Sequence, residues 1–170
     1  MSIIALLAAV AIPAFSAALE SARRAKCAGN LRQIGIGFQQ YANDNDQNYP
    51  VVYNSNAPSD SLYWYNSVAT ALGQDPSSAW VKGGWFDCPD STNGVPGYTM
   101  SWAVSGVKTV NIHTTQLLAA DGPGASGAGF NATPPYGGID LTRHRGGANF
   151  LYVDGHVEYS QAVDTNSITP

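Results

Sequence analysis

The sequence predicts an α+β protein in which a long N-terminal helix packs on a small antiparallel β-sheet head with long loops. Residues 1–19 carry no charge and continue without a turn signal into a helical pattern that reaches about Asp46. Residues 148–160 have the pattern of a β-hairpin. The chain between these two elements is rich in Gly, Pro, Asn and Ser, which favour turns between short strands. We therefore divide the chain into a helix at residues 1–47 and a β-rich head at residues 48–170.

The first nineteen residues are apolar on every side of the predicted helix. At about 1.5 Å per residue they would span roughly 28 Å, close to the hydrocarbon thickness of a bilayer. A proline inside such a segment is tolerated where neighbouring helices satisfy the freed carbonyl group. We expect residues 1–19 to form a membrane anchor or the core of a filament. The side chains expected in this contact are Ile3, Ile4, Leu6, Leu7, Val10, Ile12, Pro13 and Phe15.

Two other interpretations of this first segment are open. A secretory signal peptide normally has Lys or Arg before its apolar run, and neither precedes the run in this sequence. A buried core helix would have to be covered on all sides, which is a wide apolar circumference for a domain this small. Length and flanking residues favour the anchor or filament core over both alternatives.

Residues 20–47 predict a continuation of the helix with a single apolar face. One apolar stripe recurs at spacings of four and three residues: Cys27, Leu31, Ile34, Phe38 and Tyr41. We expect this stripe to pack on the head. The turn-forming run that begins at Asn43 and leads to Pro50 ends the helix.

Charge is distributed unevenly along the chain. Residues 1–32 carry four basic side chains and one acidic one, whereas residues 33–170 carry four basic and eleven acidic ones. A short basic cluster beside an acidic head excludes a nucleic-acid surface, so no nucleic acid is expected as a partner. The sequence contains no nucleophile elbow, paired carboxylates or HExxH motif. We therefore expect no enzyme activity and no cofactor.

The chain has two cysteines. Cys27 lies on the apolar stripe, and Cys88 lies in the turn-like segment at residues 86–90. Their separation matches no zinc or haem spacing. In an exported chain a disulfide that holds the head on the helix is the simplest interpretation, and closing so long a loop contributes about 4 kcal/mol in the chain-entropy model. Two unpaired buried thiols are the alternative.

The hairpin prediction rests on the dipeptide Asp154-Gly155 between alternating residues. Asp-Gly favours a two-residue type I′ turn, in which both central residues take positive φ. Such a turn would pair Tyr152 with Val157. It would place one set of side chains on the face that packs against the helix: Phe150, Tyr152, Val157 and Tyr159.

Residues 98–104 and 115–120 are the other predicted strands, and the remainder of the head is predicted as loop. Asn131 begins an Asn-Ala-Thr sequon that permits glycosylation in a host with the machinery.

Taken together, these segments resemble the type IV pilin-like proteins, in particular prepilin-type proteins with an H-x9-DG motif. His144 and Asp154-Gly155 match that motif, with nine residues between His and Asp. Residues 25–35 are similar to the family's Cys-x-x-Asn-Leu-Lys-Gln-Ile-Gly helix segment. Shorter segments that resemble family landmarks follow in the expected order at residues 41–45, 86–90 and 118–122.

The resemblance implies a type IV pilin-like fold and a structural subunit that polymerises into an extracellular filament. Such a subunit waits in the membrane as an anchored precursor, is extracted by inner-membrane assembly machinery, and forms a helical homo-oligomer displayed at the cell surface. A minor pseudopilin of a type II secretion-like system is the alternative. A third hypothesis is a ligand- or metal-binding surface protein, whose candidate residues are His113, His144, His156, Asp121 and Asp154.

The sequence departs from the family pattern at its beginning. The basic leader, the Gly at the peptidase cut and the following Phe-Thr-Leu-Ile-Glu of the family do not occur in it. We therefore expect that a leader and several mature residues are missing, and cleavage by a prepilin peptidase is assigned to no residue of this chain.

Overall fold

A computed structural model describes residues 2–58, 63–91, 96–123, 129–130 and 138–168. It confirms the α+β class, with a long N-terminal helix and a small five-stranded sheet. The helices are α1 (Ser2–Asp44), α2 (Trp64–Ala71) and the short turn α3 (Arg143–Gly146). The strands are β1 (Tyr98–Ser101), β2 (Leu117–Asp121), β3 (Gly129–Phe130), β4 (Ala148–Tyr152) and β5 (Val157–Ser160). The 3-10 turns among the described residues include Pro76–Trp80, Trp102–Val104, Thr109–Asn111 and Thr165–Ser167.

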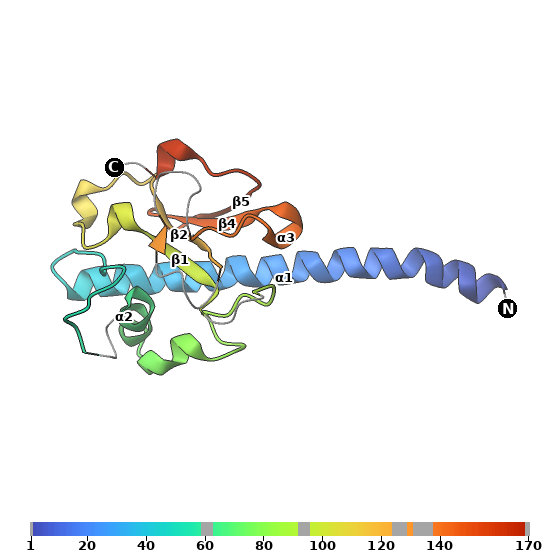
Figure 1. The fold of residues 1–170 in the computed structure, drawn as a ribbon, viewed down its shortest axis with the longest axis horizontal. Helices are drawn as coiled ribbons and strands as arrows, with labels where there is room; N and C mark the ends of the chain where they lie inside the picture. The colour runs from blue at the N-terminus through green and yellow to red at the C-terminus, as the bar shows by residue number, and fades with distance from the viewer. Residues whose placement is uncertain (1, 59–62, 92–95, 124–128, 131–137, 169–170) are drawn as a thin grey trace.

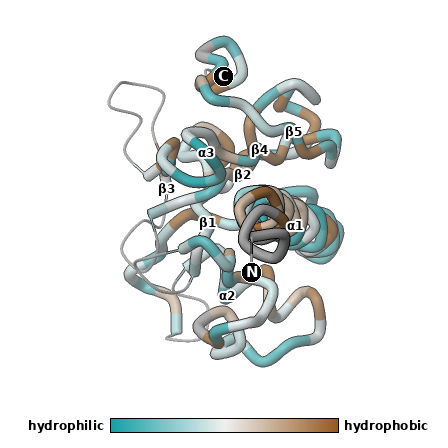
Figure 2. The backbone as a smooth tube through the Cα atoms, turned by 90° about the vertical axis from the view of Figure 1, so that its right-hand side faces the viewer, coloured by the Kyte–Doolittle hydropathy of each residue, from teal (hydrophilic) through white to brown (hydrophobic). Residues whose placement is uncertain are grey.

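Helix α1 extends well beyond the head, and the N-terminus lies at the far end of the protruding part (Figure 1). The helix has 43 residues and is therefore about 65 Å long. It runs through Pro13 without interruption. The head encloses only its C-terminal part, with the sheet on one side and α2 on the other (Figure 2).

The sequence predicted that residues 1–19 form a membrane anchor or the core of a filament. Within the residues that the structure describes, no helix combines the length and the apolar character needed to cross a membrane.

The apolar stripe of α1 forms the centre of the head's core, as predicted. Cys27, Leu31, Ile34 and Phe38 are fully buried, whereas Tyr41 is only partly covered. The Phe38 ring stacks on Trp64 of α2 with 5.2 Å between ring centroids. This close approach requires a glycine at position 37, because a Cβ there would lie 2.6 Å from a methyl group of Val68.

The sheet has the order β3-β1-β2-β4-β5. Its β1–β2, β2–β4 and β4–β5 pairs are antiparallel, but β1 and β3 are parallel. The sheet is therefore mixed: three of these pairs have the predicted antiparallel arrangement, and the pairing of β3 with β1 departs from it. Because β3 pairs at the edge beside β1 after a long excursion of the chain, its direction could not be read from local turn signals.

The predicted hairpin exists, but its register was wrong by one residue. Leu151 pairs with Val157, and the N–H of Gly155 donates to the Tyr152 carbonyl at 2.9 Å. Gly155 has a positive φ of 88°, but Asp154 does not. The connection is thus a three-residue loop with a glycine bulge instead of a type I′ turn. The Asp154 carboxylate accepts the N–H of His156 at 3.0 Å, and this local contact favours the longer loop.

The shift in register exchanges the faces of half the hairpin side chains. Val157 packs in the core with Leu151, and the Arg24 guanidinium on α1 lies 4.5 Å above the Tyr159 ring. Phe150 and Tyr152 instead belong to a second apolar cluster on the opposite face of the sheet. The prediction that one hairpin face packs all four of its side chains on the helix (Phe150, Tyr152, Val157 and Tyr159) was therefore wrong.

Candidate functional site

The protruding part of α1 exposes several large apolar side chains, and we call residues 7–19 the assembly segment. Four of its large apolar side chains are between 65% and 70% exposed: Leu7, Val10, Ile12 and Phe15. Leu19 is also exposed where the helix reaches the head. Large exposed apolar patches are rare on soluble monomers and mark sites of interaction with other molecules.

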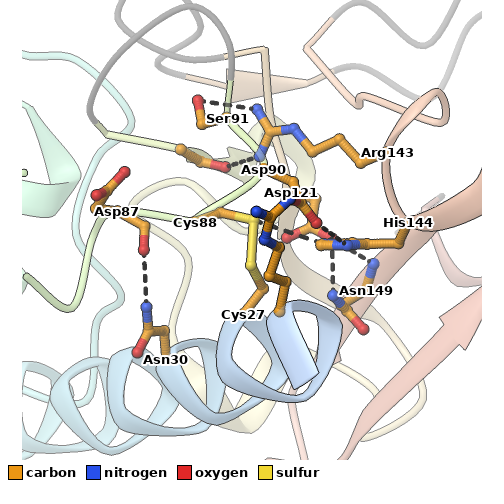
Figure 3. The surroundings of a disulfide bond; sticks show 12 residues. Cys27, Asn30, Asp87, Cys88, Asp90, Ser91, Asp121, Arg143, His144 and Asn149 are labelled. Atoms are coloured by element: carbon orange, nitrogen blue, oxygen red, sulfur yellow. Dashed lines mark hydrogen bonds and ion pairs between the residues drawn. A yellow bond between two sulfur atoms is a disulfide. The ribbon is translucent and has the colours of Figure 1, made fainter. Parts of the chain in front are cut away.

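A largely buried polar cluster lies where α1 enters the head, immediately after the assembly segment along the helix. We call it the His144 cluster, and its members are Glu20 on α1, Asp90, Asp121 at the end of β2, His144 and Asn149 on β4. The disulfide between Cys27 and Cys88 adjoins it, with a Cys88 sulfur 3.5 Å from Nε2 of His144 (Figure 3). The sequence allowed either a disulfide or two free thiols at these positions. The structure contains the disulfide.

The turn α3 holds His144 in an unusual backbone conformation. His144 has φ 46° and ψ 47°, and Arg145 has φ 66° and ψ 40°. Residues other than glycine reach this left-handed region at a cost of roughly 1–2 kcal/mol each. The Tyr159 hydroxyl donates to the His144 carbonyl at 2.8 Å and helps to fix the turn. Backbone strain of this kind is concentrated at functional sites, which directs attention to the His144 side chain.

The neighbouring Arg143 is buried and fully engaged in positioning α3. Its Nε donates to Asp140 at 2.9 Å, and its Nη1 donates to the Gly97 carbonyl at 2.8 Å. Its Nη2 donates to the Gly122 carbonyl and, at 3.3 Å, to the hydroxyl of Ser91. A planar guanidinium is suited to joining several loops in this way. Arg143 thus ties the segments before β1 and after β2 to the turn.

Three carboxylates surround the fully buried imidazole of His144. Its Nε2 lies 3.4 Å from Asp121 Oδ2, while its Nδ1 lies 2.9 Å from Asp90 Oδ2 and 3.5 Å from Glu20 Oε1. Burial lowers the pKa of His144, but the hydrogen bond to Asp121 and the charges of the three carboxylates outweigh it. The pKa is therefore raised above its ordinary value.

Asp121 is the most firmly held of these carboxylates. Its Oδ2 accepts the backbone N–H of Asn149 at 2.7 Å and the Asn149 side-chain amide at 2.9 Å (Figure 3). These contacts fix the carboxylate against one edge of the imidazole. The other edge of the ring, at Nδ1, faces Asp90 and Glu20.

The predicted site residues do not all come together. His144 lies in the buried cluster, whereas Asp154 lies in the exposed hairpin turn and contacts Nδ1 of His156 at 2.5 Å. The two ends of the H-x9-DG motif therefore lie in different parts of the head. His113 is exposed. Asn131 lies outside the described residues, as do the side chains of Ile3, Ile4 and Leu6.

Sequence reasoning missed Glu20 and Asp90 as members of a cluster. A signal for both was present. Glu20 precedes Cys27 by seven residues, which places it two turns away on the same helix face, and Asp90 follows Cys88 by two residues. A disulfide between the two cysteines would therefore bring these carboxylates near each other.

Comparison with known proteins gives one partial match. Residues 16–77 match a family model described as a protein of unknown function (DUF1559). The matched segment contains the apolar stripe and α2, but Cys88 and the H-x9-DG motif lie outside it. No curated protein and no solved structure matches the chain.

Proposed function

We propose that this protein is a structural subunit of an extracellular type IV pilus-like filament. The observation that carries this proposal is the contrast along α1. The head buries one half of the helix, while the assembly segment presents apolar side chains on every side. A surface of this kind is suited to a bundle of equivalent helices.

The energetics favour assembly through this segment. Full burial of one large apolar side chain contributes about 1.5–3 kcal/mol. The four most exposed side chains of the segment therefore offer several kcal/mol per subunit, against the entropy lost on association. Before assembly the same surface is compatible with lipid, and exchanging lipid for neighbouring helices is then governed by packing.

The proposal has further parts that follow from the resemblance to pilin-like proteins. The partners are other copies of this chain and, before polymerisation, an inner-membrane assembly machinery. The precursor pool is held at the membrane, and the product lies at the cell surface. The chain has a structural role and is not an enzyme.

Electron microscopy of native surface material, combined with mass spectrometry of purified filaments, tests the proposal. We expect filaments in which this chain is the main component. We further expect them to disappear when Ile12→Asp places a carboxylate in the helix bundle, where an unpaired charge is costly. Filaments that contain the chain only in traces would favour a minor pseudopilin, and unchanged filaments with Ile12→Asp would contradict assembly through α1.

A further inference from the structure

Three donor atoms from distant parts of the chain converge in the His144 cluster. Glu20, Asp90 and His144 each offer one ligand atom within 4.8 Å of the others. Nδ1 of His144 lies 2.9 Å from Oδ2 of Asp90 and 3.5 Å from Oε1 of Glu20. Each atom is buried and has no hydrogen-bond partner among the described residues. Nδ1 and Oδ2 of Asp90 are only 2.9 Å apart, yet they are not aligned as a hydrogen bond. Buried polar atoms almost always have a partner, so these three require an explanation.

We infer that Glu20, Asp90 and His144 bind a divalent transition-metal ion, for which Zn²⁺ is the natural probe. Zn–N and Zn–O bonds of about 2.0–2.2 Å place neighbouring ligands of a tetrahedral ion roughly 3.3 Å apart. The separations of 2.9 Å and 3.5 Å from Nδ1 to the two carboxylates bracket that value. The mixed imidazole and carboxylate donor set suits zinc and its neighbours better than calcium, which takes oxygen ligands.

The surroundings of His144 are those of a metal-bound histidine. Its Nε2–H faces Asp121, which Asn149 holds in place through two hydrogen bonds. A carboxylate at this position fixes the tautomer and leaves the lone pair of Nδ1 for the metal. The left-handed backbone at His144 directs the side chain into the cluster.

Charge and space at the site also agree with a cation. The two negative charges of the Glu20 and Asp90 carboxylates balance the charge of a divalent ion, and a neutral imidazole adds none. The second oxygen of Asp90 contacts Arg23 at 3.3 Å, which leaves Oδ2 for the metal. A cavity of about 130 Å³ borders Glu20 and His144 and has room for water in the remaining coordination position. The ion would join α1, the segment after Cys88 and α3 at the point where the helix leaves the head.

The test uses the full chain after removal of metals by a chelator. We expect Zn²⁺ to bind with one-to-one stoichiometry in calorimetry and to raise the Tm, because an ion that binds only the folded state stabilises it. Co²⁺ should give visible absorption bands typical of nitrogen and oxygen ligands. Glu20→Gln and Asp90→Asn should each weaken binding at least tenfold and remove the Tm shift. Glu158→Gln, the same chemical change at an exposed site on β5, should leave binding unchanged.

Circular dichroism without metal checks that the variants fold. Since Glu20 is partly exposed on a helix, Glu20→Gln keeps the test valid even if Asp90→Asn unfolds. Absence of saturable Zn²⁺ and Co²⁺ binding would overturn the inference. Binding that survives both substitutions, or an NMR spectrum in which Nδ1 of His144 keeps a proton at saturating Zn²⁺, would overturn it as well. These outcomes are independent of whether the chain forms filaments.

Discussion

The two halves of α1 contain similar apolar side chains in opposite surroundings. In the C-terminal half, Leu31, Ile34 and Phe38 are fully buried, and this half of the helix lies between the sheet and α2 (Figure 2). In the N-terminal half, Val10 and Phe15 are each 70% exposed. Both halves belong to one uninterrupted helix, so intrinsic helix propensity does not distinguish them. The described head therefore covers one half only, and we propose that the other half packs against further copies of this chain.

The largest expected difference concerns two phenylalanines on the same helix. Phe38→Ala should lower the free energy of unfolding by about 3–5 kcal/mol, because it leaves a cavity beside Trp64 and Tyr49. Phe15→Ala should change it by less than about 0.5 kcal/mol. Urea unfolding of the monomeric full chain measures both values. Equal losses for the two variants would remove the distinction between the halves.

The disulfide is the next largest effect, since it attaches the buried half of α1 to the head. Replacing both Cys27 and Cys88 with Ala should lower the free energy of unfolding by about 2–5 kcal/mol. Urea unfolding of the oxidised wild type and of the double variant measures the difference. A loss below about 0.5 kcal/mol would show that packing alone holds the helix in the head.

Two glycines of α1 lie in different surroundings and should respond to substitution in opposite directions. Gly37→Ala should lower stability by about 1 kcal/mol, because overpacking against Val68 exceeds the gain in helix propensity. Gly29→Ala meets no atom within 4 Å and should raise stability by about 0.5–1 kcal/mol. Thermal unfolding shows whether each substitution raises or lowers stability. A stabilising Gly37→Ala would mean that α2 packs less closely on the helix than described.

A change in the hairpin that covers the buried half should have an effect comparable to those of the two helix glycines. Gly155→Val should cost at least about 1 kcal/mol, because a β-branched residue resists the positive φ at this position. Gly155→Asn should cost less, since Asn tolerates the left-handed region. Chemical denaturation compares the two. Equal losses would indicate that φ at residue 155 is not what limits this turn.

Elements with strong local patterns could be predicted from the sequence. The spacing of Cys27, Leu31, Ile34 and Phe38 identified the buried face of α1, because a helix repeats its face every three to four residues. Helix α2 was missed and treated as loop. It is short, has no side-chain cap at Tyr63 and contains aromatic and β-branched residues that favour strands equally.

Features that depend on contacts between distant segments could not be predicted. The His144 cluster unites α1, the segment after Cys88, β2 and α3, and no local pattern fixes such a meeting. The predicted register of the hairpin was wrong for a more local reason. The side chain of Asp154 accepts a hydrogen bond from the N–H of His156, and this contact favours the three-residue loop. Turn sequences predict that a turn exists more reliably than they predict its length.

We propose that the assembly segment joins copies of this chain. This proposal is tested most directly by comparing Val10→Asp with Val110→Asp, since these valines are 70% and 79% exposed on the protruding helix and on the head. At protein concentrations low enough to keep all three chains monomeric, both variants should unfold at the same urea concentration as the wild type, since assembly itself raises apparent stability. In sedimentation velocity and electron microscopy, the wild type and Val110→Asp should form large assemblies, and Val10→Asp should remain monomeric. Assembly of Val10→Asp at the wild-type level would contradict the account.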